Sequence, residues 1–502
     1  MSTSALHYHL RTSYDRYRMS GHSLDWSAQP EVFKSYRDRP AFALPQVTRW
    51  PQDRISDTYL GKIEPEPETA VSLDRLATIL MLTQALTAKS SHGGTDFYFR
   101  SVASAGALYP FETYVSCRNV PGLADGMYHH AVARQLLIQL GQGDYTAVDL
   151  PSAPVPEESV AAVTFFLTAI FFRSSWKYRD RAYRYHLLDT GHLGENLAQA
   201  LTVSRMPFCL SYDFDDESVN DLLGLDTNRE VCLAVAAGWG KAARGHEKEA
   251  THGVSGDVEP ASHVSAREVD YPEIREIHKI SSTVITGPGP GQMLGNLGLN
   301  VGRDSMSVAT DRFPKTLGYA DALFTRRSMR NFVRDQLPAD TFGALVKAVC
   351  TDADARGRPL DETLAVGMLT QDVEGIEAGF YVLDRARASF NPVAYGNKME
   401  RMASVCLNQE WLGNCAIHFL FLSNIGSIER LWGARAYRYA LLSAGRLGQR
   451  LYVTSSALHI GCCGIGAFYD EEAARLLELP EECHLLYLVA CGPVKKRSLG
   501  RK

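Results

Sequence analysis

The 502-residue sequence lacks the run of about 20 apolar residues that a membrane-spanning helix requires. Its first residues also lack the apolar core of a secretory signal peptide. Hydrophobic residues make up 45% of the chain and charged residues 22%, which is typical of globular proteins. We therefore expect a cytoplasmic protein without a membrane partner.

Two further absences exclude kinds of site and partner. The ten cysteines are dispersed, apart from the adjacent Cys462 and Cys463, and none forms the Cys-x-x-Cys pair typical of zinc sites. The net charge of −5 provides no basic excess for binding a phosphate backbone. We expect reduced and mostly buried thiols, no metal ion and no nucleic-acid partner.

What the sequence does contain is an internal repeat. RAYRYHLLDTGHLGENL begins at Arg181, and RAYRYALLSAGRLGQRL begins at Arg435, an offset of 254 residues. FDDESVNDLLGL from Phe214 matches FYDEEAARLLEL from Phe468 at the same offset. Matches at a constant offset indicate one ancestral domain that was duplicated within the chain.

The composition suggests where the two copies begin and end. Residues 243–268 are polar and rich in Gly, Ser, Glu and His, which is typical of a linker. We also interpret GPGPG at 287–291 as linker, because its prolines remove the N–H donors that a phosphate-binding loop needs. The predicted organisation is an N-terminal arm at 1–48, a first domain at 49–242, a linker at 243–315 and a second domain at 316–502.

Each copy mixes helical and strand patterns. Apolar residues recur at helical spacing in residues 73–86, 185–201 and 342–350. Strand-like segments, several of them almost continuously apolar, occupy residues 111–117, 162–172, 416–423 and 484–492. We therefore predict the α+β class, with a sheet packed against helices in each domain.

A loop of small residues carries a family resemblance. SVASAGALYPFETYV at 101–115 resembles the PSAGALYP signature of the nitroreductase superfamily, and in particular its SagB/ThcOx-type branch of azoline dehydrogenases. WKYRDRAYRYHLLDTGHLGENL at 176–197 and RRSMRNF at 326–332 agree with this resemblance, although Ala103 replaces the usual proline. The resemblance implies two fused nitroreductase-like domains that form an intramolecular pseudo-dimer and bind FMN at their interface.

The two copies retain complementary parts of the implied FMN site. The first copy keeps Ser104, Ala105, Gly106 and Leu108, and its small residues would let the backbone approach a flat ring. The second copy carries an arginine cluster, a glycine-containing turn and a basic tail. These cofactor-binding candidates are Arg326, Arg327, Ser328 and Arg330, then Gly464, Ile465 and Gly466, then Lys495 and Lys496.

Neither set of parts recurs in the other copy. The first copy has LGKIE at 60–64 opposite the arginine cluster, with Leu210 and Tyr212 opposite Gly464 and Gly466. The second copy has nothing like SAGALYP around residues 354–364. We therefore predict one composite FMN site per chain.

The resemblance also identifies an acid/base pair. In the SagB/ThcOx-type branch a Lys-Tyr pair serves this role, and Lys177 and Tyr178 occupy its place here, whereas the second copy has Leu431 and Trp432. Converting an azoline to an azole removes a hydride and a proton, so a base is required, and lysine can serve when burial or nearby cations lower its pKa. The implied activity is FMN-dependent oxidation of thiazoline or oxazoline rings in ribosomal peptide natural-product biosynthesis, with dioxygen accepting the electrons.

Two other interpretations stay open. The protein could be an FMN-dependent desaturase or small-molecule oxidase that uses Lys177 and Tyr178 on another substrate, or a flavin-free scaffold of a cyclodehydratase complex. A scaffold would need neither half of the FMN site. For the dehydrogenase we expect a peptide substrate, held through a leader segment, and a cyclodehydratase partner. We interpret His192 as a satisfied polar side chain, and the tyrosines of the two RAYRY segments as packing residues.

Overall fold

The computed structural model describes residues 4–19, 21, 23–59, 61–66, 70–92, 95–150, 161–240, 253–254, 259–285, 297–302, 304–308, 316–350 and 363–495. In these segments no helix combines the length and apolar character needed to cross a membrane. The same segments contain no group of three or more His, Cys, Asp and Glu side chains placed to hold a metal ion. All ten cysteines are free thiols, and only Cys350 is not buried.

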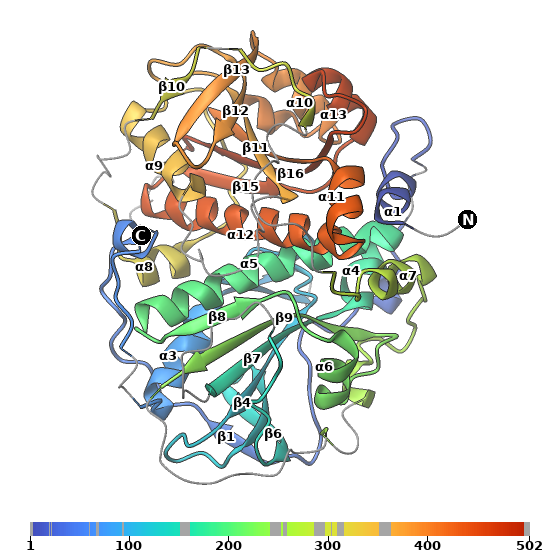
Figure 1. The fold of residues 1–502 in the computed structure, drawn as a ribbon, viewed down its shortest axis with the longest axis vertical. Coiled ribbons are helices and arrows are strands. Elements are labelled where there is room, and N and C mark those ends of the chain that lie inside the picture. The colour runs from blue at the N-terminus through green and yellow to red at the C-terminus, as the bar shows by residue number, and fades with distance from the viewer. Residues whose placement is uncertain are drawn as a thin grey trace.

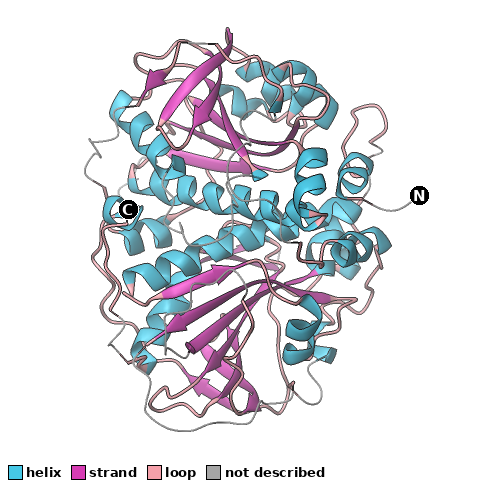
Figure 2. Cartoon of the chain, viewed as in Figure 1, coloured by secondary structure: helices cyan, strands magenta, loops and turns pink. Residues whose placement is uncertain are grey.

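Two antiparallel sheets with the same strand order form the two ends of the molecule (Figures 1 and 2). The first sheet runs β1 (Ala41–Ala43), β6 (Leu136–Gln142), β5 (Gly126–Ala131), β4 (Phe111–Cys117), β7 (Ala161–Ile170), β9 (Glu230–Trp239) and β8 (Phe208–Ser211). The second runs β10 (Met306–Ser307), β13 (Ser389–Tyr395), β12 (Gly379–Asp384), β11 (Ala365–Thr370), β14 (Ile417–Ser423), β16 (His484–Gly492) and β15 (Gly461–Ile465). The matching orders confirm two α+β domains of one kind.

Helices pack against both sheets, and the longest of them lie between the two. The two longest, α5 (Ala182–Val203) and α12 (Arg435–Ala457), contain the repeated segments and lie against each other at the centre of the molecule (Figure 1). The first copy adds α2 (Ile55–Tyr59), α3 (Leu73–Thr83), α4 (Phe171–Tyr178), α6 (Asp216–Leu223) and the hairpin β2 (Leu86–His92) and β3 (Thr95–Arg100). The second adds α8 (Tyr319–Thr325), α9 (Ala339–Cys350), α10 (Met399–Val405), α11 (Ile425–Trp432) and α13 (Asp470–Leu477).

The two long helices touch backbone to backbone where Gly191 faces Gly445. A Cβ atom at Gly445 would overlap the carbonyl oxygen of Leu188, and one at Gly191 would overlap the carbonyl oxygen of Leu442. A helix carbonyl is held by its own hydrogen bond, so it cannot move aside cheaply. This close approach explains why the repeat has glycine at both positions.

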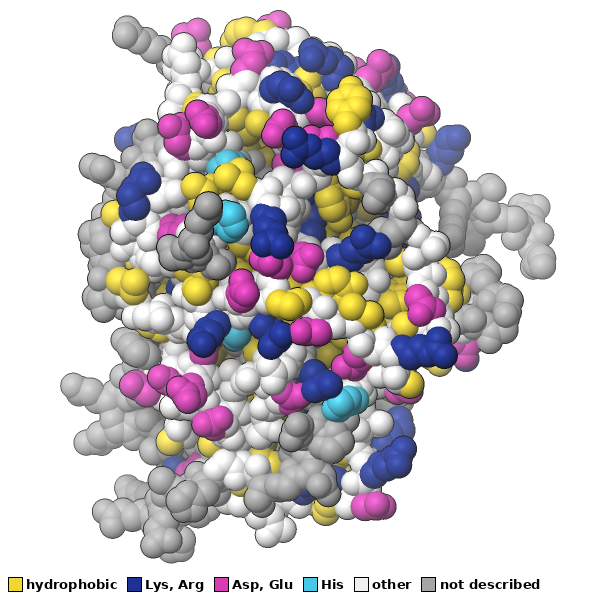
Figure 3. All heavy atoms as spheres, turned by 90° about the vertical axis from the view of Figure 1, so that its right-hand side faces the viewer, with side chains coloured by type: hydrophobic (Ala, Val, Ile, Leu, Met, Phe, Trp, Pro, Cys, Tyr) yellow, Lys and Arg dark blue, Asp and Glu magenta, His cyan; other side chains and the backbone are white. Residues whose placement is uncertain are grey.

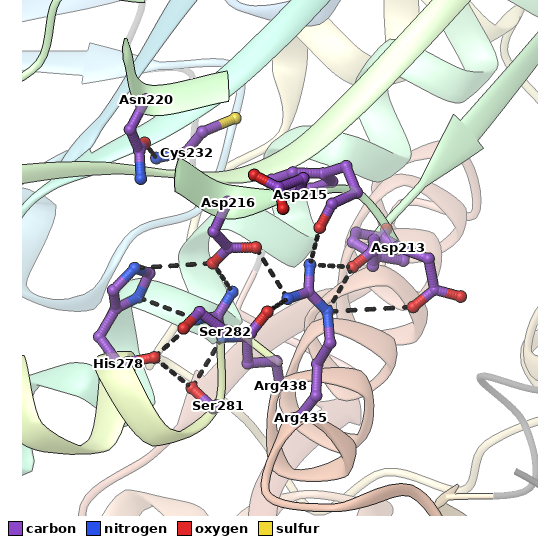
Figure 4. Close-up of polar contacts among 12 residues, drawn as sticks. Asp213, Asp215, Asp216, Asn220, Cys232, His278, Ser281, Ser282, Arg435 and Arg438 are labelled. Atoms are coloured by element: carbon purple, nitrogen blue, oxygen red, sulfur yellow. Dashed lines mark hydrogen bonds and ion pairs between the residues drawn. The ribbon is translucent and has the colours of Figure 1, made fainter. Parts of the chain in front are cut away.

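Reciprocal buried ion pairs join the copies. At the start of each long helix, two arginines bind one aspartate of the other copy, and the second set repeats the first at the offset of 254 residues. Removing one member of such a buried set leaves an unpaired charge, which costs about 3–5 kcal/mol. In one set, Arg181 and Arg184 bind Asp470 at 2.8 and 2.9 Å. In the other set, shown in Figure 4, Arg435 and Arg438 bind Asp216 at 2.7 and 2.5 Å.

The predicted arm and linker each supply a helix to this arrangement, α1 (Ala5–Arg11) and α7 (Pro272–Ile280). His9 Nδ1 lies 3.2 Å from Tyr437 Oη, and His278 Nδ1 lies 3.2 Å from Tyr183 Oη. HLRTS from His9 and HKISS from His278 are therefore counterparts at an offset of 269 residues. The duplication extends further toward the N-terminus than the offset of 254 revealed.

Helices α1 and α7 also bind each other on one face of the molecule. Arg11 of α1 lies 2.7 Å from the carboxylate of Glu273 on α7. Glu429 of α11 accepts hydrogen bonds from the first two N–H groups of α1. Figure 3 shows this side of the molecule, where the basic and acidic side chains of the described residues are mixed with one another. The described part of this face therefore presents no continuous basic track.

Three segments differ from the sequence interpretation. Residues 41–43, assigned to the arm, form β1 and pair with β6, and residues 306–307, assigned to the linker, form β10 and pair with β13. Strands of two or three residues are too short for an alternating pattern to be recognised. The apolar run at 162–172 is not a single strand, because β7 ends at Ile170 and α4 begins at Phe171. The GPGPG segment lies outside the described residues.

The crossing of the two long helices can be tested at Gly445. Gly445→Ala adds a methyl group against the backbone of α5, so we expect the free energy of unfolding to fall by about 2 kcal/mol in urea denaturation. Gly194→Ala is the control on the same helix pair, because its Cβ would lie at an ordinary 3.4 Å from Tyr212 Oη. Helix propensity predicts unchanged or higher stability for the control. Equal unfolding midpoints for the two variants would contradict the proposed contact.

Candidate functional site

A cavity lies between the two copies, beside the crossing of α5 and α12. The first copy lines it with the loop Ala103–Gly106, with Tyr178 and with residues of α5. The second copy lines it with Ser328 and Arg330 after α8, with Tyr452 and Tyr487, and with the stretch Cys463–Ala467 at the end of β15. Because both copies form its walls, neither copy alone could form this cavity.

The small-residue loop makes room for the Lys-Tyr pair. Gly106 has a φ of +65°, a backbone conformation that favours glycine. A Cβ atom there would lie 2.9 Å from Tyr178 Oη and 3.3 Å from Lys177 Nζ. The absent side chain therefore leaves room for the two candidate acid/base residues, which are about 70 residues away in the chain; Tyr178 is among the residues that line the cavity, and Lys177 is not.

Asp189 of α5 anchors this loop. Ser104 Oγ donates a hydrogen bond to its carboxyl group at 2.6 Å, and the N–H of Ala105 donates a second at 3.2 Å. Burial raises the pKa of Asp189 to about 7, and these two bonds oppose the rise. Sequence reasoning missed Asp189, although one signal was available: Ser443 stands at its place in the otherwise similar second repeat.

Burial shifts the Lys-Tyr pair in opposite directions. It lowers the pKa of Lys177, and the nearby Arg330 cation lowers it further. It raises the pKa of Tyr178, and the carboxyl group of Asp189 contributes to that rise. Lys177 therefore releases its proton more readily than an exposed lysine, whereas Tyr178 remains a phenol that can donate a hydrogen bond.

The arginine cluster divides between the cavity and the domain contact. Ser328 and Arg330 line the cavity. The Arg326 guanidinium instead donates to the carbonyl oxygens of Ser101 and Arg100, both at 2.8 Å, and Arg327 donates to the carbonyl of Thr87 at 3.1 Å. Arg326 and Arg327 thus bind backbone carbonyls of the first copy and are not among the residues that line the cavity, and their role toward a cofactor stays a prediction.

The glycine-containing turn lines the cavity, but one of its N–H groups is already bound. Gly464, Ile465 and Gly466 are all lining residues. The N–H of Gly464 donates to Tyr452 Oη at 2.7 Å, so this donor is already bound within the protein. A Cβ at Gly464 would overlap Tyr487 Oη, and one at Gly466 would lie 2.5 Å from the ring of Tyr185.

The remaining candidate residues either do not line the cavity or lie outside the described residues. Leu108 is buried in an apolar cluster with Phe172 and Trp176. The backbone N–H of Lys495 donates to the carbonyl of Asn331 at 3.0 Å, and the residue itself is exposed. Lys496 lies outside the described residues.

The symmetry-related position in the other half is filled by side chains. Leu210 and Tyr212 stand in the places of Gly464 and Gly466, and both are buried. Tyr439, the counterpart of Tyr185, donates a hydrogen bond to Asp213, where the cavity side has Ala467. The segment that would correspond to the small-residue loop, residues 354–362, lies outside the described residues.

Comparisons with known proteins match both copies. The family model described as "Nitroreductase family" matches residues 66–239 and 323–493, which together make up more than half of the chain. A solved structure from Anabaena variabilis, described as a nitroreductase, is 26% identical with a TM-score of 0.77, and the match covers 98% of this chain and 99% of that chain. A Methanocaldococcus jannaschii protein named as a nitroreductase is 26% identical over 167 residues, 32% of this chain and 84% of that protein.

The buried carboxyl group of Asp189 predicts a pH dependence of stability. Its pKa of about 7 in the folded protein exceeds the value near 4 expected in the unfolded chain. Between pH 4 and pH 7 the unfolded chain therefore binds fewer protons, and the free energy of unfolding falls as the pH rises. Asp189→Asn removes this titration. Between pH 4 and pH 7 we therefore expect the free energy of unfolding, measured by urea denaturation, to fall by at least ~1 kcal/mol less in the variant than in the unsubstituted protein.

The matched control for this measurement is Asp335→Asn, which changes an exposed aspartate outside the cavity lining. We expect its stability to follow that of the unsubstituted protein at each pH. Parallel curves for Asp189→Asn and the unsubstituted protein would show that Asp189 is not the titrating group.

Proposed function

Because the chain belongs to the nitroreductase family and is an oxidoreductase of that superfamily, we propose that it is an FMN-dependent dehydrogenase of a modified peptide. The proposed reaction oxidises thiazoline or oxazoline rings to thiazole or oxazole. The observation that carries the proposal is the position of Tyr178 in a cavity lined by both copies, with Lys177 beside the same small-residue loop. The proposed functional unit is one chain, with its domains at 49–242 and 316–502.

The residues around the cavity fit FMN. Small residues line both sides, with Ala105 and Gly106 on the first copy and Gly464 and Gly466 on the second, so backbone and aromatic surface can contact a flat ring. Arg330 and the neighbouring Ser328 hydroxyl supply the kind of donors that bind a phosphate. When bound, FMN would supply the hydride acceptor of the oxidation.

Lys177 is the proposed base. Aromatisation of an azoline removes one hydride and one proton, and the proton needs an acceptor within reach of the ring. Burial and Arg330 lower the pKa of Lys177, which enlarges its neutral fraction near pH 7. Tyr178 keeps its proton and can hold the substrate by donating a hydrogen bond. The electrons would then pass to dioxygen.

The chemistry of the proposed substrate sets the class of the preceding reaction. An azoline forms when a Cys, Ser or Thr side chain closes onto the preceding amide carbon with loss of water. A cyclodehydratase must therefore supply the substrate, and we propose such an enzyme as a partner. The peptide would be held outside the cavity through a leader segment, while a single ring enters it.

The cofactor content of the protein tests the proposed FMN site. We expect the purified protein to show a flavin absorption spectrum and to release about one FMN per chain on denaturation, since the symmetry-related position is filled by Leu210 and Tyr212. Two FMN per chain would show that this position opens to bind a second flavin. No FMN, even after incubation with excess, would overturn the dehydrogenase and favour the flavin-free scaffold.

A variant of Lys177 tests the proposed base. Lys177→Ala should retain FMN but oxidise a synthetic thiazoline peptide at least ~100-fold more slowly, because general base catalysis of this kind contributes 10²–10⁴-fold. The rate is measured from azole absorbance and oxygen consumption. Lys62→Ala removes an exposed lysine outside the cavity lining and should leave the rate unchanged. Undiminished turnover by Lys177→Ala would assign the proton transfer to another group.

A further inference from the structure

A chain of hydrogen bonds crosses both long helices and ends at the cavity. Asn196 Nδ2 donates to the carbonyl oxygen of Thr83 at 3.1 Å. Gln449 Nε2 donates to Asn196 Oδ1 at 2.8 Å. His192 Nδ1 lies 2.9 Å from Gln449 Oε1, and His192 Nε2 lies 3.1 Å from Tyr487 Oη. Both His192 and Tyr487 line the cavity.

The direction of every bond in this chain follows from the backbone carbonyl at its start. A carbonyl oxygen can only accept, so Asn196 must turn its NH₂ group toward Thr83 and its oxygen toward Gln449. Gln449 must then present its NH₂ group to Asn196, which leaves Gln449 Oε1 to accept from His192. The proton of the imidazole therefore resides on Nδ1, and Nε2 is an acceptor for the hydroxyl proton of Tyr487.

The surroundings preserve this direction at neutral pH. Burial lowers the pKa of His192 to about 4, so the imidazole is neutral and has one acceptor nitrogen. Burial also raises the pKa of Tyr487, so the phenol keeps its proton. With that proton donated to His192, the oxygen of Tyr487 has only acceptor capacity left.

The other half has charged residues in place of His192 and Gln449. At the offset of 254 residues, Arg446 replaces His192, Glu195 replaces Gln449, and Leu233 replaces Tyr487. Arg446 Nε lies 2.9 Å from Glu195, which forms an ion pair where the cavity side has a neutral bond. An ion pair at these positions also holds the helices together, so helix packing does not require the chain of neutral hydrogen bonds. That chain of hydrogen bonds occurs on the side that has the cavity.

We propose that Tyr487 is a specificity-determining residue that presents a hydrogen-bond acceptor of fixed direction to an N–H or O–H group of the bound ligand. Asn196, Gln449 and His192 are the positioning residues that fix this direction. The nature of the ligand rests on the proposed function: the donor group belongs either to FMN or to the azoline peptide.

The tautomer of His192 tests the direction without any ligand. In a long-range ¹H–¹⁵N spectrum of the folded protein, we expect the His192 signal to show a protonated Nδ1 and an unprotonated Nε2. His192→Gln identifies the signal by its loss, and Gln449→Met, which removes the acceptor for Nδ1, should shift the tautomer toward Nε2–H. A protonated Nε2 in the unsubstituted protein would overturn the proposal, whether or not the protein proves to be a dehydrogenase.

Tyr487→Phe tests the acceptor itself. Loss of one net hydrogen bond corresponds to a weakening of about threefold to tenfold. A higher dissociation constant for FMN, measured by flavin fluorescence, would place the donor on FMN, whereas unchanged FMN affinity with a higher KM for a thiazoline peptide would place it on the substrate. If neither constant changes, Tyr487 is not an acceptor for the ligand.

The control for that experiment is Tyr381→Phe. Tyr381 is also a buried strand tyrosine of the second sheet, but its hydroxyl donates to the carbonyl of Glu377 and it does not line the cavity. We expect this variant to bind FMN and the peptide like the unsubstituted protein. Because the spectrum of His192 needs no flavin, failure to bind FMN would overturn the proposed function without deciding the hydrogen-bond direction.

Discussion

The backbone contact between Gly191 and Gly445 sets the distance between the two copies. With no side chain at either position, α5 and α12 approach until a Cβ at Gly191 would lie 3.0 Å from the Cα of Gly445. Contacts that cross the interface depend on this spacing, including the bond between His192 and Gln449 and the packing of Tyr185 over Gly466. A wider separation would leave buried polar groups unpaired, which costs about 1–3 kcal/mol each.

Symmetry and asymmetry divide the interface between stability and chemistry. The arginine–aspartate pairs occur twice, with the arginines on a different copy each time. They hold the two copies in register both on the side that has the cavity and on the side that lacks it. The cavity instead depends on positions where the copies differ: Asp189 against Ser443, and Gly466 against Tyr212. Duplication supplies two potential sites, and side chains then fill one of them while the other retains the space for a ligand.

The sequence predicted the duplicated α+β fold well because periodicity and internal repetition report directly on burial. It could not predict where Arg326 points, since a guanidinium binds a backbone carbonyl as readily as a phosphate and the chain does not show which one is near. Strand β1 was missed because three residues carry no period. Asp189 was missed because its partners, Ser104 and Ala105, are about 85 residues away in the chain and come together only in the fold.

The charges around the cavity agree with a site where negative charge develops. Hydride transfer delivers an electron pair to the acceptor, so cations nearby favour the transfer and an ionised carboxylate opposes it. Arg330 lines the cavity, and its charge helps to lower the pKa of Lys177. Two buried groups that line the cavity carry little charge, since burial keeps His192 uncharged and holds much of Asp189 in its protonated form up to about pH 7. The ion pairs that the other half uses at this depth, such as Arg446 with Glu195, would place a buried carboxylate next to the ligand.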